Sequence, residues 1–264
     1  MLDVHPPHHP THTWQDFFIH IATICVGLLI AIGLEQAVES IHHHHQREFL
    51  EDQMHEESVQ NLDLVRAQIL FCSERHAYLN DSIRALQNAT PDGGQLIVTL
   101  PLDTVSLPSS SQGLLISPSR GTWTVAKAAG TVALLPADTA KVYARLELVN
   151  DFEQTAENAL GDSAATLAST RLKDHANGNG HPLRLTPAQV DDLLKSFGDA
   201  SEATANFHFR LVVLEGALEA VGAHATTLQQ MYPYQIRAIA REGAAASANR
   251  ARDNTTPSAQ PSTR

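Results

Sequence analysis

The segment FFIHIATICVGLLIAIGL, residues Phe17–Leu34, decides how the rest of the chain is interpreted. It contains 18 residues without Lys, Arg, Asp or Glu, and it lies between Asp16 and Glu35. At about 1.5 Å of rise per residue, a helix of this length spans roughly 27 Å, close to the hydrocarbon thickness of a bilayer. Trp14 precedes it at the position of an interfacial anchor. The segment therefore predicts a single transmembrane helix over residues 17–34.

Two other interpretations of this segment are a cleaved signal peptide and a buried helix of a globular domain. Ala31-Ile32-Gly33 has the small residues that precede a cleavage site. However, the first 16 residues contain no Lys or Arg, whereas a signal peptide has a basic N-terminal region. The polar flanks disfavour a buried globular helix. A membrane anchor is preferred, and the lone Arg47 shortly after the span leaves the side of the soluble domain undetermined.

Small residues recur every fourth position within the predicted span. Thr23, Gly27 and Ala31 line one face of a helix, and such a pattern lets two membrane helices approach closely. The alternative is that Gly and Ala are simply common in membrane helices. We expect this face to support self-association.

Composition favours an acidic, helical soluble domain. The formal net charge is -11, which repels nucleic-acid phosphates, so no nucleic-acid partner is expected. Aromatic residues make up only 5% of the chain, which favours slim, closely packed helices over an aromatic-rich sheet. We therefore predict an all-α fold, with the lipid bilayer and other membrane proteins, or a second copy of the chain, as partners.

No Pro or Gly interrupts the chain from Glu35 to Thr90, so the membrane helix should continue as a stalk helix. Its distal half has a seam with alternating spacings of three and four residues, typical of helix packing. The seam consists of Leu62, Val65, Ile69, Cys72, His76, Leu79, Ile83 and Leu86. Residues 90–120 are rich in Pro, Gly and Ser and predict an irregular excursion, with short extended pieces at 95–100 and 114–116.

Further helices follow this excursion. A short helix is expected at 122–129, ending at Gly130, and another from Pro136 with the apolar stripe Val142, Leu146, Val149, Phe152, Ala156 and Leu160. Thr186, Pro187 and Gln189 indicate a capped helix start, with a break expected around Gly198. A last helix should bury Phe207, Leu211, Leu214, Leu218, Val221, Ala225 and Leu228. These helices and the stalk predict a bundle.

The predicted organisation thus has five parts. They are a His-rich N-terminal tail at 1–16, a transmembrane helix at 17–34, a stalk helix at 35–89, a helical soluble domain with an irregular loop at 90–242, and a disordered tail at 243–264.

Histidine is over-represented near the apolar segment, with eleven of the 15 histidines before residue 80. On a helix, Glu39 and His43 share a face, and His42 and His45 are three residues apart. Such side chains are candidate metal ligands, especially beside a second chain. Four consecutive histidines point to all sides of a helix, however, and imidazoles are also compatible with headgroup depth. The metal site therefore stays a secondary hypothesis, and no cofactor is expected.

The chain lacks the compact catalytic and nucleotide-binding signatures, including G-x-S-x-G, H-E-x-x-H, Walker A and paired C-x-x-C. We therefore expect no enzyme activity.

Two stretches carry a resemblance to known proteins. HTWQDFFIHIATICVGLLIAIGLEQAVESIHHHHQ, residues 12–46, resembles the membrane segment of uncharacterised single-pass bacterial proteins of unknown function. GTWTVAKAAGTVALLPADTAKVYARL, residues 121–146, is similar to a second recurrent element of such families. The resemblance implies a single-pass protein of the bacterial inner membrane and implies no catalytic residue. The leading hypothesis is a membrane-anchored scaffold or accessory subunit. The alternative is a membrane-tethered sensor that binds metal or protons through its histidines.

Overall fold

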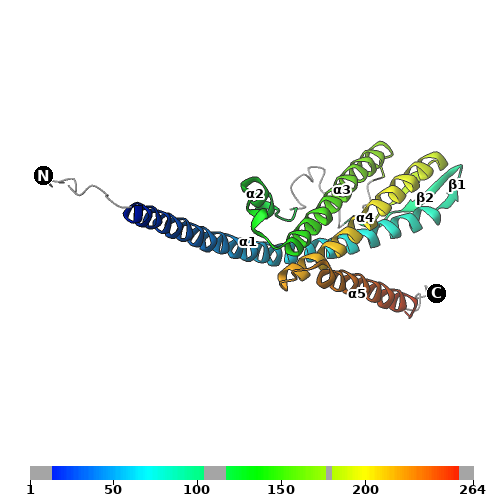
Figure 1. Cartoon of the computed structure of the whole chain (residues 1–264). Helices are drawn as coiled ribbons and strands as arrows, with labels where there is room; N and C mark the ends of the chain where they lie inside the picture. The colour runs from blue at the N-terminus through cyan, green and yellow to red at the C-terminus, as the bar shows by residue number, and fades with distance from the viewer. Residues whose placement is uncertain (1–13, 104–116, 177–179, 256–264) are drawn as a thin grey trace. The chain divides into compact units, whose positions relative to one another are not determined.

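The computed structural model describes residues 14–103, 117–176 and 180–255 of the chain. These residues form mainly helices: α1 Trp14–Gln87, α2 Gly121–Ala129, α3 Ala137–Lys173, α4 Pro187–Gly222 and α5 Leu228–Thr255 (Figure 1). A 3₁₀ helix covers Thr131–Leu134, and three short strands are β1 Thr90–Asp92, β2 Gln95–Thr99 and β3 Pro182–Leu185. The predicted all-α class, with a long N-terminal helix and a bundle of later helices, is confirmed.

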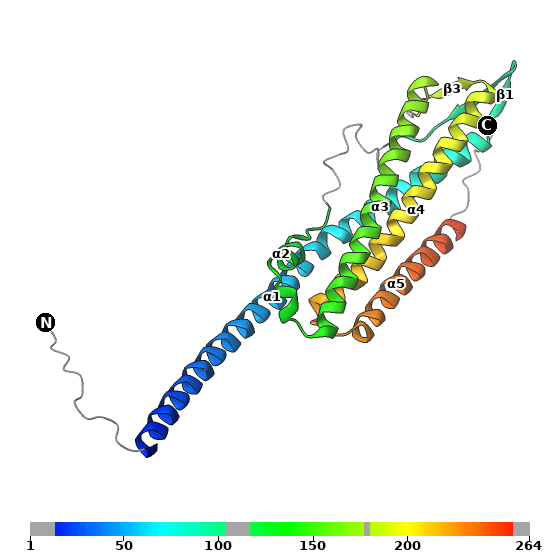
Figure 2. The same cartoon turned by 45° about the horizontal axis from the view of Figure 1, so that its top comes forward.

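The chain divides into two compact units, residues 1–50 and residues 51–264. Within the described residues, the first unit consists of the N-terminal part of α1 alone. The second unit contains the remainder of α1, the other helices and the sheet. Figures 1 and 2 show α3 and α4 side by side in this second unit, with α5 beside α4.

The distal part of α1 buries one face with a seven-residue period. The buried positions alternate by four and three residues: Met54, Ser58, Asn61, Val65, Gln68, Cys72, Arg75, Leu79, Ser82 and Leu86. The predicted seam is therefore half confirmed, because Val65, Cys72, Leu79 and Leu86 are buried. Its other members, Leu62, Ile69, His76 and Ile83, are only half-buried. The buried face of α1 instead includes a row of polar side chains between its apolar positions, and a search for apolar periodicity does not detect them.

Local signals at several helix ends predicted the structure well. Thr186 caps α4 in a capping box: its hydroxyl accepts from Gln189 N–H at 3.3 Å, and Gln189 Oε1 accepts from Thr186 N–H at 2.8 Å. Helix α2 ends at Gly130, whose φ of 75° is left-handed and suits a residue without Cβ. Helix α3 begins directly after Pro136, as expected.

The predicted break at Gly198 is wrong. Helix α4 continues through Gly198 to Gly222, and the chain turns at residues 223–227 instead. Tertiary packing overrides the weak helix propensity of one glycine, because the neighbouring Phe197 and Ala200 are fully buried. Leu228 consequently begins α5 rather than ending the preceding helix.

The stripe expected on the helix after Pro136 is buried except at one position. Phe152 is 45% exposed and receives the guanidinium of Arg210, 5.4 Å from its ring centroid. The cation covers one face of this ring outside the core, which explains how a large aromatic residue is accommodated at the surface.

Part of the predicted irregular excursion at 90–120 is ordered as a sheet. Strands β1 and β2 form an antiparallel hairpin, and β3 pairs antiparallel with β2 through Leu96↔Leu185 and Val98↔Leu183. Gly93 and Gly94 have φ of 57° and 85°, as a two-residue hairpin turn requires. The extended piece expected at 95–100 is thus confirmed over Gln95–Thr99. The piece expected at 114–116 lies outside the described residues.

Helix α5 extends further than composition suggested. Its Ala- and Arg-rich end continues past Gly243 to Thr255, where we expected disorder from residue 243 onward. Alanine is the strongest helix former. This segment, which is rich in Ala but has no larger apolar side chains for a core, can therefore still form a helix. Residues 256–264 of the predicted tail lie outside the described part.

A hydrophobic cluster joins α1, α3, α4 and the sheet. Its members include Tyr78, Leu79, Leu86, Val98, Leu100, Leu167, Leu185, Leu193 and Phe197. Because β2 and β3 contribute alternate side chains to it, the small sheet closes one end of the bundle core.

Gly216 sets the distance between α4 and α5. A Cβ added there would lie 2.5 Å from Gln235 Cα and 2.8 Å from its backbone nitrogen. The backbones of α4 and α5 therefore lie so close together at this crossing that a side chain larger than that of glycine at position 216 would collide with α5.

We predict that Gly216→Ala displaces α5 and lowers the free energy of unfolding by about 2 kcal/mol, because backbone atoms rather than a flexible side chain must move. Urea unfolding and limited proteolysis of α5 in the full-length chain measure this. Gly198→Ala is the matched control, since nothing lies within 4 Å of its Cβ position. It should leave stability unchanged or raise it by up to about 1 kcal/mol. Equal effects of the two substitutions would contradict the close crossing.

Candidate functional site

The apolar segment of α1 has its side chains exposed throughout. None of the most apolar 18-residue window of α1 is buried, and its mean hydropathy is 2.5. Ile24 is 69% exposed, Leu29 68% and Leu34 64%. By length and composition this helix can cross a membrane. Its full exposure differs from the burial expected for the core helix of a globular domain.

The small residues of this segment lie where predicted, on one face of a continuous helix. Thr23 Oγ1 donates to the Ile19 carbonyl at 2.8 Å, which satisfies the hydroxyl within the helix. A Cβ added at Gly27 would have no neighbouring atom within 4 Å, and Ala31 is exposed. The face is therefore open to a second helix, and its role in self-association stays a prediction.

The predicted metal ligands Glu39, His42, His43 and His45 do not converge. Glu39 Oε1 lies 3.8 Å from His43 Nε2. His42 instead accepts from Gln46 at 2.9 Å, and His45 lies 3.7 Å from Glu48. Among the described residues, no group of three or more His, Cys, Asp or Glu side chains is placed to hold a metal ion. A metal site in this run would need ligands from a second chain.

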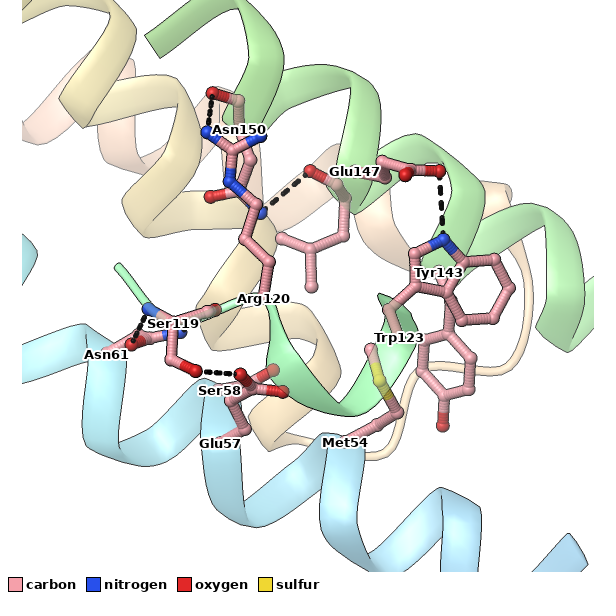
Figure 3. A pocket seen from close by; sticks show the side chains of 11 residues that line it. Met54, Glu57, Ser58, Asn61, Ser119, Arg120, Trp123, Tyr143, Glu147 and Asn150 are labelled. Atoms are coloured by element: carbon pink, nitrogen blue, oxygen red, sulfur yellow. Dashed lines mark hydrogen bonds between the residues drawn. The ribbon is translucent and has the colours of Figure 1, made fainter. Parts of the chain in front are cut away.

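A polar clamp fastens the start of α2 to α1 (Figure 3). The Glu57 carboxylate accepts from Gly121 N–H at 2.8 Å, from Thr122 N–H at 3.0 Å and from the Ser119 hydroxyl. One turn further along α1, Asn61 exchanges two hydrogen bonds of 2.8 Å with the Ser119 backbone. A carboxylate at a helix N-terminus satisfies free N–H groups and the helix dipole, so Glu57 acts as a remote cap for α2.

The other side of the clamp is formed by α3. Arg120 donates to Asp151 at 2.7 Å. Trp123 Nε1 donates to Glu147 at 2.9 Å (Figure 3). Hydrogen bonds from Lys127 and Trp123 hold the pKa of Glu147 below its ordinary value. The cavity between these side chains measures about 20 Å³, enough for a single water molecule. The clamp is therefore a structural joint between α1, α2 and α3 rather than a ligand pocket.

Sequence reasoning missed this joint. Glu57 and Asn61 lie on a polar stretch of the stalk, and nothing in their local pattern relates them to residues about 60 positions later. The one available signal was the absence of a capping side chain at the start of α2, where Arg120 makes no side-chain cap.

A second buried polar group fixes the segment after β2. Asp103 forms an ion pair with Arg171 of α3, and its charge also acts on Arg75 and Tyr78 of α1. Burial lowers the pKa of Arg75, and the Asp103 carboxylate offsets part of this effect. Arg75 belongs to the buried face of α1, as Asn61 does. Asn61 of this face therefore bonds to Ser119, and Arg75 lies within reach of the Asp103 charge.

An ion network joins α1, α4 and α5. Arg66 contacts Glu215 and Glu219 at 3.0 Å each, and Arg241 contacts the same carboxylates at 3.1 and 2.9 Å. Both carboxylates are shielded, with about 13% and 15% of their side chains exposed. Hydrogen bonds to these carboxylates raise the pKa of both arginines. Networks of this kind fix helix register more than they add stability.

Glu153 on α3 is the most unusual ionisable residue of the bundle. It is fully buried, and neither carboxylate oxygen has a hydrogen-bond partner among the described residues. Burial raises its pKa to about 7, the Glu157 carboxylate adds to this, and Arg120 partly opposes it. Glu153 therefore changes its protonation near neutral pH.

No family model, no curated protein and no solved structure matches the chain.

Glu57→Gln should weaken the remote cap of α2. A neutral amide has one acceptor oxygen for three donors and no charge for the helix dipole, so a loss of about 1 kcal/mol is expected locally. Hydrogen exchange at residues 121 and 122 should accelerate several-fold. The matched control is Glu56→Gln, because among the described residues the hydrogen bonds of Glu56 come from Gln53 and Gln60 of the same helix. Unchanged protection in Glu57→Gln would contradict the cap.

Glu153→Gln should remove a pH dependence of stability. The folded-state pKa of Glu153 lies above the ordinary value of 4.5, so the folded state favours the protonated carboxyl. The contribution of this group to the free energy of unfolding is therefore fully present below pH 4.5 and is lost as pH rises through about 7. At pH 8 the variant should be more stable than wild type by about 3 kcal/mol, and at pH 5 the difference should be small.

Urea unfolding of the full-length chain measures this, with Trp123 fluorescence as the reporter in a Trp14→Phe background. Asp162→Asn is the control, because Asp162 is an exposed acid on the same helix. Parallel pH profiles for Glu153→Gln and wild type would show that the Glu153 carboxylate is not the titrating group.

Proposed function

We propose that this chain is a membrane-anchored helical interaction protein, a scaffold or accessory subunit that associates with itself or with other membrane proteins. The observation that carries the proposal is the uncharged apolar segment at the start of α1, whose side chains are exposed throughout. Leaving so many apolar side chains in water is strongly unfavourable, whereas a bilayer covers all of them. The resemblance of residues 12–46 supports a bacterial inner membrane as the site.

The bundle also offers a surface for a partner. Tyr232, Ile236 and Ile239 follow a spacing of four and three residues on one face of α5 and are 45%, 66% and 41% exposed. An apolar stripe on a surface helix is the usual contact for another helix. The net charge of -11 favours partners other than nucleic acid.

The membrane face offers a second contact. Thr23, Gly27 and Ala31 allow close approach of another copy of α1, because small residues permit helix backbones to touch. Two copies joined there would place two bundles together and would suit the role of a scaffold.

We predict that the full-length chain stays in the membrane pellet after alkaline carbonate extraction of bacterial membranes, and that two differently tagged copies co-purify from those membranes. Gly27→Leu should reduce co-purification several-fold, because a large side chain separates the two helix backbones. Gly33→Leu is the matched control: it makes the same change on a different face of the helix, and both glycines have no neighbouring atom within 4 Å.

Either of two results would contradict the proposal. Recovery of the chain in the carbonate supernatant would refute the anchor. A chain that pellets but purifies alone, without a second copy or another membrane protein, would refute the interaction role.

A further inference from the structure

A groove lies between the distal part of α1, α4 and α5, outside the clamp described above. Its volume is about 480 Å³, within the range of small-molecule sites. The residues that define its character are His76 from α1, Ala205, His208 and Phe209 from α4, and Ile239 and Glu242 from α5. All three helices belong to the second unit, so the groove is independent of the membrane segment.

One part of the groove is apolar. Phe209 is 49% exposed and Ile239 41% exposed, although both lie where three helices meet. A molecule covering these side chains would remove apolar surface from water, which is favourable by roughly 25 cal/mol per Å². An apolar body of limited size therefore fits this part of the groove.

The other part contains the Glu242 carboxylate. The Glu242 carboxylate lies 3.4 Å from His208 Nε2, and among the described residues this imidazole is its ion-pair partner. Burial lowers the pKa of His208, with Glu242 opposing this effect and His76 adding to it, which favours the neutral imidazole beside the carboxylate.

Neither of the nearby arginines pairs with Glu242 among the described residues, although Arg210 borders the groove at Phe209. Arg241 pairs with Glu215 and Glu219, and Arg210 lies 5.4 Å and 5.9 Å from the ring centroids of Phe152 and Phe209. The negative charge of Glu242 is therefore available to a ligand.

His76 supplies a second acceptor. The Ser201 hydroxyl donates its single proton to Asn80 Oδ1 at 3.3 Å. The Ser201 Oγ atom also lies 3.4 Å from His76 Nδ1. Because a hydroxyl has one proton, Ser201 accepts from His76 Nδ1–H, and this tautomer makes Nε2 an acceptor. The polar part of the groove thus combines a carboxylate with an imidazole acceptor.

We propose that this groove binds a small organic ammonium ion, whose apolar body covers Phe209 and Ile239 and whose N–H groups donate to the Glu242 carboxylate and to His76. An ammonium ion carries three donors and a positive charge, which complements two acceptors and one negative charge. A metal ion fits less well, because the described residues hold no group of three metal-ligating side chains.

The test uses three probes of similar shape and different charge: 2-phenylethylammonium, 2-phenylethanol and 3-phenylpropionate. Binding to the full-length chain in detergent is measured by calorimetry or ligand-observed NMR. The ammonium ion should bind about 10-fold more tightly than the alcohol, since charge-assisted hydrogen bonds are the stronger ones, and the anion should not bind.

Two variants locate the site. Glu242→Gln should lower the affinity for the ammonium ion about 10-fold, to that of the alcohol, because the carboxylate charge is lost. Ala205→Leu should weaken both the ammonium ion and the alcohol by filling the groove. Glu202→Gln is the matched control, an exposed acid of α4 outside the groove, and should bind like wild type. Far-UV circular dichroism confirms that each variant is folded.

Three results would overturn the proposal. Equal binding of the ammonium ion and the alcohol would show a general apolar surface. Unchanged ammonium binding in Glu242→Gln would place the charge recognition elsewhere. The absence of ammonium binding to the wild-type chain at concentrations up to about 10 mM, roughly 10-fold above a millimolar Kd, would exclude the site.

Discussion

Burial of one face of α1 over residues 54–86 is the interaction on which the bundle depends. An isolated helix gains little stability from its own hydrogen bonds, so this face has to be covered by other elements. Leu79 and Leu86 pack with Phe197 of α4 and Leu167 of α3 in a common core. Helix α5 then docks on α4 at Gly216, and the sheet closes one end of the core. Each later element thus covers surface that the preceding ones leave exposed.

The polar members of this buried face have a different role. Asn61 and Arg75 are as buried as their apolar neighbours, yet they act on the connection between β2 and α2 rather than on another helix. Buried polar groups need partners: the Ser119 backbone accepts from Asn61, and the Asp103 charge acts on Arg75. The same helix therefore orders two kinds of structure: its apolar positions assemble the bundle, and its polar positions fix where the connection begins and ends.

Charge is distributed unevenly through the bundle. Glu215 and Glu219 are shielded but each contacts arginines from two helices, so their charges are balanced. Glu153 and Glu242 lack such arginine partners among the described residues: the first is sealed inside the core and the second faces a groove. An unbalanced carboxylate in a sealed core responds to protons, whereas one beside a groove also attracts a cation. Burial and access together decide which chemistry each carboxylate can perform.

The sequence by itself determined the elements that depend on local or one-dimensional signals. The apolar run, the uninterrupted helix through residue 87, the cap at Thr186 and the stop at Gly130 follow from neighbours within a few residues. Only the tertiary structure decided the polar half of the α1 seam, the continuity of α4 through Gly198, the pairing of β3 with β2, and the meeting of His76, His208 and Glu242. The physical reason is that these features arise between residues far apart in the chain. Their free energy comes from burial and pairing, which no local spacing or propensity records.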